Sequence, residues 1–210
     1  ATIPLRGSHT SAAAVILVGV LSQDEAMASV DWNTLGLLLG MMLIVNITRR
    51  SGLFQYVAIW SAKKVDARPW GVMLMMSIVT AVFSALLDNV TTVLLTVPVT
   101  LLITEELRVK PYPYLFAQIF ASNIGGTATL IGDPPNIMIG SAVGLTFNDF
   151  VLALSPVVVV VLAVTMVPLY FIWGRHLRAT PEDRRRVMNF SERETITDPR
   201  LLKQSLVVIG

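Results

Sequence analysis

Residues 154–173 form a run of 20 residues without one charged side chain. A helix of about 20 apolar residues is the length that crosses the hydrocarbon core of a bilayer. Further apolar runs cover residues 34–47, 70–87, 93–103 and 114–124. Apolar residues make up 54% of the 210 and charged residues 14%, which is less charge than a soluble domain usually carries. The sequence therefore predicts an all-α membrane protein.

The basic residues are confined to segments that can share one side of a membrane. All 16 Lys and Arg lie at Arg6, within residues 49–68, at Arg108 and Lys110, or within residues 175–203. The connections at residues 23–31 and 146–150 hold acidic residues and no basic one. By the positive-inside rule the basic loops are cytoplasmic. We expect a multi-pass integral protein of the plasma or inner membrane.

Residues 70–107 are flanked by basic residues at both ends and so must return to the side where they start. Two antiparallel helices achieve this, with a turn at residues 88–92, Asp-Asn-Val-Thr-Thr. The length of each arm does not decide whether the tip stops inside the bilayer, as in a re-entrant hairpin, or reaches the far surface. The alternative is an external loop in which Asp88 or Asn89 caps the second helix.

A second polar stretch, residues 121–136, reads ASNIGGTATLIGDPPN and lies within the crossing expected at residues 114–143. Its glycines are poor helix formers, and the two prolines remove amide donors. We expect two half-helices joined by an unwound segment that exposes backbone carbonyls and amides. Broken helices of this kind form ion and substrate sites in secondary transporters. The alternative is an ordinary extramembrane loop.

The side chains of both stretches suit a cation or a proton. Asp133 could bind either one. Asp88 has apolar flanks, so its ionised form would need water, a cation or hydrogen bonds nearby. A carboxylate that alternates between a proton and a metal ion could couple their transport. Hydroxyl and amide oxygens suited to a hard cation such as sodium come from Ser122, Asn123, Thr127, Thr129 and Asn136.

The rest of the chain supports simpler expectations. Residues 11–21 are a span or the remnant of one, and residues 53–62 an amphipathic helix at the cytoplasmic interface. Residues 174–203 are a charged, solvated cytoplasmic linker. Glu105 and Glu106 lie close to Arg108 in the sequence, and we expect a surface salt bridge there. Without cysteine, and without a P-loop or nucleophile elbow, the chain predicts neither an enzyme nor a cofactor, and no nucleic-acid partner.

Two motifs resemble a known family. Residues 84–100, SALLDNVTTVLLTVPVT, and residues 122–141, SNIGGTATLIGDPPNIMIGS, are similar to the first half of ion transporter superfamily permeases. The nearest group is that of the arsenite permeases, NhaD antiporters and pink-eyed dilution protein, with a citrate transporter-like domain. The resemblance covers roughly residues 32–173.

The resemblance implies the fold of the divalent anion/sodium symporters. That fold has two inverted repeats, each with a re-entrant hairpin and a broken helix, and usually forms a homodimer. Residues 1–173 would be the first repeat, with its hairpin at 70–107, broken helix at 114–143 and span at 154–173. Residues 204–210 would begin the second repeat, most of which is expected after Gly210.

The resemblance also implies site roles. In those symporters a Ser-Asn-Thr tip and a break ending in Gly-Thr-Pro-Pro-Asn bind sodium and the substrate carboxylate. Here Asp88 replaces the tip serine and Asp133 the break threonine, which adds negative charge and favours cations or protons over a dicarboxylate. Coupling-ion roles fall on Asp88, Asn89, Asn123, Gly125 and Asp133. Substrate roles fall on Thr91, Thr92, Gly126, Thr127, Gly132, Pro135 and Asn136.

The expected function is secondary active transport by alternating access. The cargo would be an ion or metalloid oxyanion, coupled to sodium or protons. One alternative is a sodium-coupled citrate or dicarboxylate transporter. An alternative of another class is a membrane scaffold or assembly subunit that transports nothing.

Overall fold

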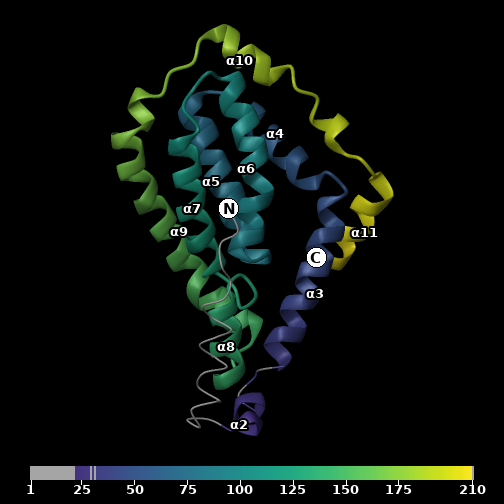
Figure 1. Ribbon diagram of the computed structural model, residues 1–210. Helices are drawn as coiled ribbons and strands as arrows, with labels where there is room; N and C mark the ends of the chain where they lie inside the picture. The colour runs from purple at the N-terminus through teal and green to yellow at the C-terminus, as the bar shows by residue number, and fades with distance from the viewer. Residues whose placement is uncertain (1–21, 29, 31, 210) are drawn as a thin grey trace. The chain divides into compact units, whose positions relative to one another are not determined.

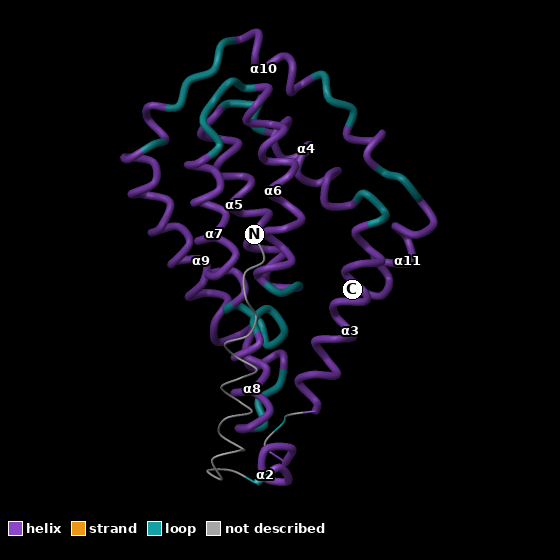
Figure 2. The backbone as a smooth tube through the Cα atoms, viewed as in Figure 1, coloured by secondary structure: helices purple, strands orange, loops and turns teal. Residues whose placement is uncertain are grey.

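The computed structural model describes residues 22–28, 30 and 32–209. The described part of the chain is helical throughout, with turns and loops and no strand (Figure 2). The chain forms two compact units, Ala1–Leu37 and Leu38–Gly210. The span expected at residues 11–21 lies outside the described residues.

The first unit contains helix α2 (Gln23–Ala28) and the start of α3 (Trp32–Arg49). Ser22 caps α2, since its hydroxyl accepts from the backbone N–H of Glu25 at 3.2 Å while Glu25 Oε2 accepts from the N–H of Ser22 at 2.9 Å. This reciprocal pair satisfies two amides that the first turn of a helix leaves without partners.

In the second unit, α5 (Pro69–Leu86) and α6 (Asn89–Glu106) form the predicted helical hairpin (Figure 1). The turn is shorter than expected, because Asn89 to Thr92 already belong to the first turn of α6. Only Leu87 and Asp88 separate the two helices. Whether the tip lies inside a bilayer stays a prediction.

The crossing expected at residues 114–143 is not one continuous helix. α7 (Tyr112–Gly126) and α8 (Pro134–Val143) are separated by the non-helical residues 127–133. Gly125 and Gly126 complete the last turn of α7, although their helix propensity is low, because α7 packs closely on α5. The two prolines start α8, where a missing N–H costs no hydrogen bond.

Helix α9 (Phe147–Ile172) begins earlier than the predicted residue 154. Thr146 caps it: the Thr146 hydroxyl accepts from the Asp149 N–H at 3.3 Å, and Asp149 Oδ2 accepts from the Thr146 N–H at 2.8 Å. Among the described helices, α5 and α9 are long and apolar enough to cross a membrane. Most of α9 is exposed.

The amphipathic helix expected at residues 53–62 is α4 (Leu53–Lys64), and its buried face packs on α5 and α6. Position at a membrane interface stays a prediction for α4. Phe54 meets Phe83 of α5 edge to face, with ring centroids 4.9 Å apart.

The charged linker is folded, although most of its described residues remain at least partly exposed. It contains the short 3-10 helices η1 (Gly174–His176) and η2 (Glu192–Thr195), with α10 (Pro181–Met188) between them, and leads into α11 (Pro199–Ile209). In Figure 1 it arches over the end of the bundle opposite α8. Val187 is fully buried in the same core as Ile103 and Tyr114.

Ion pairs hold the linker in place. Lys63 Nζ contacts Glu192 Oε2 at 2.6 Å, and Arg108 Nε lies 3.6 Å from Asp183 Oδ1. Arg108 therefore pairs with the linker, and the salt bridge expected with Glu105 or Glu106 is not the one formed. The sequence pattern missed this pair because its members lie 75 residues apart.

Candidate functional site

The hairpin tip and the helix break meet. Asn89, at the start of α6, donates from Nδ2 to Asn123 Oδ1 in the last turns of α7 at 3.2 Å. The side-chain amide of Asn123 in turn donates to the Ile119 carbonyl at 2.7 Å, which fixes its orientation. The hairpin tip and the broken helix, two separate polar stretches of the sequence, are thus in direct contact and form one candidate site.

The two carboxylates of the candidate site, Asp88 and Asp133, interact electrostatically. Asp88 is the N-cap of α6, and its Oδ1 accepts from the Thr91 N–H at 2.8 Å. The capping alternative is therefore correct as local geometry. Asp133 occupies the N-cap position of α8 without a side-chain capping bond. The Asp88 carboxylate is therefore held by a hydrogen bond to the first turn of its helix, and the Asp133 carboxylate has no such bond.

Asn136 and Thr127 bind the backbone of the break. Asn136 Nδ2 donates to the carbonyls of Thr129 at 2.9 Å and Gly126 at 3.3 Å. The hydroxyl of Thr127 donates to the Asn123 carbonyl at 2.9 Å. These carbonyls already have partners inside the protein, so they are weaker candidates for binding an ion than the sequence suggests.

Glycine is required where the break touches the hairpin. A Cβ on Gly125 would collide with the backbone of Ala81 in α5, and one on Gly126 would lie 2.9 Å from the Gly132 carbonyl oxygen. A Cβ on Gly132 would lie 2.7 Å from the carbonyl oxygen of Ser84. These three predicted residues act by allowing backbones to approach one another.

The remaining predicted residues surround the tip or the start of α8. Thr91 gives its backbone N–H to Asp88. Thr92 is fully buried, and its hydroxyl has no hydrogen-bond partner within the described part of the chain. Pro135 is exposed in the first turn of α8. A hollow of 290 Å³ opens beside the Asn89–Asn123 contact, between α6 and α7.

Two further hydroxyls bind the hairpin to the broken helix: that of Thr129, which the sequence offered as an oxygen ligand, and that of Ser84, which the sequence analysis did not single out. Ser84 Oγ donates to the Ser122 carbonyl at 2.7 Å, and Thr129 Oγ1 donates to the Ala85 carbonyl. A signal for Ser84 was present in the sequence, because a serine in an apolar helix four residues before Asp88 needs a polar partner.

The donors available suit a hard cation or a proton. Within the described residues, no three His, Cys, Asp or Glu side chains gather as a metal-ion site. Asp88 and Asp133 instead lie among hydroxyl, amide and backbone oxygens. Ligands of this type favour hard cations over soft transition metals. Two negative charges close together in a medium of low polarity also repel each other, and a bound cation or proton relieves that repulsion.

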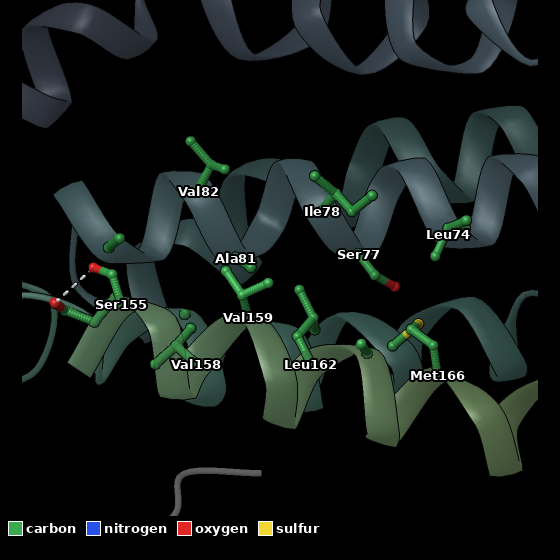
Figure 3. A pocket seen from close by; sticks show the side chains of 14 residues that line it. Leu74, Ser77, Ile78, Ala81, Val82, Ser155, Val158, Val159, Leu162 and Met166 are labelled. Atoms are coloured by element: carbon green, nitrogen blue, oxygen red, sulfur yellow. Dashed lines mark hydrogen bonds between the residues drawn. The ribbon is translucent and has the colours of Figure 1, made fainter. Parts of the chain in front are cut away.

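A larger groove of 620 Å³ lies between α5 and α9 (Figure 3). Its walls are mostly apolar and include Ile78 of α5 and Val159 and Leu162 of α9. Ser155 reaches across one end toward the Ala128 carbonyl at 3.5 Å. The lining offers too few oxygens for an ion, so the polar contact between tip and break is the better candidate site.

Comparison of the sequence with known proteins assigns the chain to a family. Residues 7–210 match the citrate transporter (CitMHS) family. The Mycobacterium tuberculosis protein named Uncharacterized transporter MT2759 is 47% identical over 208 residues, which are 97% of this chain and 48% of that protein. Magnetosome protein MamN of Paramagnetospirillum magneticum is 34% identical over 217 residues, covering 97% of this chain and 49% of its own.

The human P protein is 41% identical over 150 residues, which are 69% of this chain and 18% of that protein. Its similarity confirms the expected resemblance to the pink-eyed dilution group. The chain spans about half the length of MT2759 and MamN. With the match covering nearly all of its residues, the chain belongs to the citrate transporter family of membrane transport proteins.

Proposed function

We propose that this protein is a secondary active transporter that moves an ion or metalloid oxyanion by alternating access, coupled to sodium or protons. The coupling ion binds between the hairpin tip and the helix break, with Asp88 and Asp133 as its charged ligands. Asn89 and Asn123 orient the tip toward the break. The basic loops face the cytoplasm.

The observation that carries this proposal is the contact between the hairpin tip and the broken helix through Asn89 and Asn123, with Asp88 directly before α6 and Asp133 directly before α8. Two nearby negative charges at a break between half-helices favour a cation or proton over a dicarboxylate, which would add further negative charge. The unpartnered hydroxyl of Thr92 one helical turn away supplies another oxygen for the same ion.

A sodium-coupled citrate or dicarboxylate transporter is the second candidate. The name of the matched family favours it. The first turn of α8 also supports it, since backbone N–H groups at a helix N-terminus attract carboxylates. In both cases a second inverted repeat supplies the other half of the site, and two copies form a homodimer.

The test is transport by the full-length protein in proteoliposomes. A sodium gradient or a pH gradient is imposed separately, and uptake of sodium, arsenite and citrate is measured with isotopes while an enclosed dye reports protons. Protein-free liposomes and an ionophore that collapses the gradient are the controls. We expect one of the two gradients to drive accumulation of an inorganic ion against its own gradient.

Sodium-driven accumulation of citrate, with no movement of cations or arsenite, would establish the second candidate in place of the first. Absence of gradient-dependent movement of every solute would contradict transport and favour a membrane scaffold. Flux that is insensitive to both gradients would contradict coupling.

A further inference from the structure

The two hydroxyls that join the hairpin to the broken helix act at neighbouring positions of α5. Ser84 donates to the Ser122 carbonyl of α7, and the next residue, Ala85, accepts from the Thr129 hydroxyl in the break. Ser84 is fully buried, and Thr129 is 5% exposed. The end of α5 therefore both donates a hydrogen bond to the broken helix, through Ser84, and accepts one from it, through Ala85.

Thr129 also organises the break itself. Its Oγ1 accepts from the Gly132 N–H at 3.1 Å, and its backbone carbonyl accepts from Asn136 Nδ2 at 2.9 Å. One residue thus links the hairpin, the unwound segment and the first turn of α8.

The position of these bonds relates Thr129 to both carboxylates. Ala85, which accepts from the Thr129 hydroxyl, lies three residues before Asp88. Gly132, which donates to that hydroxyl, directly precedes Asp133. A single oxygen atom therefore connects the backbone near one carboxylate to the backbone near the other.

The backbones of the hairpin and the break are packed closely together at Gly132. A Cβ on Gly132 would lie 2.7 Å from the Ser84 carbonyl oxygen and would collide with the backbone of Gly126. Backbones that already touch can shift only by sliding past one another, and the Thr129 hydroxyl opposes that sliding.

We propose that Thr129 is a positioning residue whose hydroxyl sets the separation of Asp88 and Asp133, and with it the affinity for the coupling ion. This inference rests on the proposed function. Thr129 itself needs no contact with the ion, because it acts through the backbones of Ala85 and Gly132.

Three variants separate positioning from a general structural role. Thr129→Val keeps the shape of the side chain but leaves the Ala85 carbonyl and the Gly132 N–H without their partner. Thr129→Ser restores the hydroxyl. Thr100→Val is the matched control, because Thr100 is also buried and its hydroxyl donates within α6, to the Thr96 carbonyl at 3.0 Å.

The first readout is the distance between tip and break. The chain has no cysteine, so Val90→Cys and Met138→Cys add spin labels at exposed positions of α6 and α8 for pulsed electron resonance. We expect T129V to broaden or shift the distance distribution, and T129S and T100V to leave it unchanged.

The second readout is coupled transport in proteoliposomes. T129V should raise the half-saturating concentration of the coupling ion about tenfold, the effect of losing a buried hydrogen bond, with a smaller change in maximal rate. T129S should restore the half-saturating concentration. If T129V does not fold, Ser84→Ala removes the neighbouring bond and should change both readouts in the same direction.

An unchanged distance and an unchanged half-saturating concentration in T129V would overturn the inference. Equal effects of T129V and T100V, or failure of T129S to restore either readout, would overturn it as well. A parent protein without coupled transport would instead contradict the proposed function, and the distance readout would still decide the role of Thr129.

Discussion

At the scale of single residues, the two aspartates of the site differ in how the fold holds them. Asp88 uses one carboxylate oxygen to cap α6, while Asp133 stands at the start of α8 without a capping bond. Capping and ion binding are therefore compatible at Asp88, which can bind an ion through its second oxygen. The sequence left open whether Asp88 caps a helix or binds an ion. Because Asp88 can do both, the remaining question is whether its negative charge is needed for transport.

Substitutions at Asp88 distinguish the role of its negative charge from the role of its capping hydrogen bond. Asn caps helices as well as Asp does, whereas Ala costs about 0.5–2 kcal/mol of stability at such a position. We expect Asp88→Asn to abolish coupled transport with little change in thermal stability, and Asp88→Ala to abolish it and lower stability as well. Thermal unfolding of the purified protein and proteoliposome uptake measure the two effects. Full coupled transport in Asp88→Asn would show that Asp88 serves only as a cap.

At the scale of elements, the folded linker joins α10 to the ends of α4 and α6. Arg184 Nε donates to the Asp66 carbonyl at 2.8 Å, and Asp183 lies between Arg108 and Arg186. A hydrogen bond from the Thr180 hydroxyl, aided by these two arginines, lowers the pKa of Asp183 below its usual value of 3.8. The contact between linker and hairpin therefore depends on an ionised carboxylate.

Acid should loosen α10. Because the folded state lowers the pKa of Asp183, the stabilisation is present above about pH 3.8 and is lost as the pH falls further. Amide hydrogen exchange in residues 181–188, corrected for intrinsic rates, should lose about two- to fivefold protection between pH 5 and pH 3 relative to α6, as expected for a partly exposed ion pair.

Variants near this ion pair provide the controls. Asp183→Asn should remove the acid dependence of α10 protection. Glu182→Gln alters the exposed neighbouring carboxylate, whose side chain is 82% exposed, and should preserve the acid dependence. Identical acid dependence in Asp183→Asn would contradict the role given to Asp183.

The elements themselves could largely be predicted from the sequence, because their signals are local. Basic residues flank the hairpin, glycines and prolines lie in the break, and an apolar run makes up most of α9. Each signal lies within or beside the segment whose structure it determines. The early start of α9 could have been read from the capping pair Thr146 and Asp149.

The contacts between elements could not be predicted, because no short-range pattern records them. Thr129 donates to Ala85 across 44 residues, and Arg108 pairs with Asp183 across 75. The many charges of the linker indicated a solvated segment and gave no sign that Val187 anchors α10 in the core. The fold brings Asn89 to Asn123 and Asn136 to Gly126, and such bonds between distant residues leave no trace in the local sequence.

At the scale of the whole molecule, the chain spans about half the length of its relatives MT2759 and MamN. Its described residues contain a hairpin and a broken helix, and α9 exposes most of its apolar surface. A second inverted repeat that completes the site stays a proposal. Movement of such halves against each other would carry the ion bound at Asp88 and Asp133 across the membrane.

The most direct test of this account is uphill transport by the full-length protein carrying Asp133→Asn. The substitution removes one negative charge and breaks no capping bond, so folding should be retained. Asp66→Asn is the control, because it removes a carboxylate 65% exposed in the loop before α5, about 27 Å from the hairpin tip along an 18-residue helix.

We predict that Asp133→Asn protein in proteoliposomes loses gradient-driven accumulation by at least about tenfold, the effect of about 1.4 kcal/mol of lost ion binding, while Asp66→Asn retains it. Accumulation by Asp133→Asn equal to that of the parent protein, under the same sodium or pH gradient, would contradict the account.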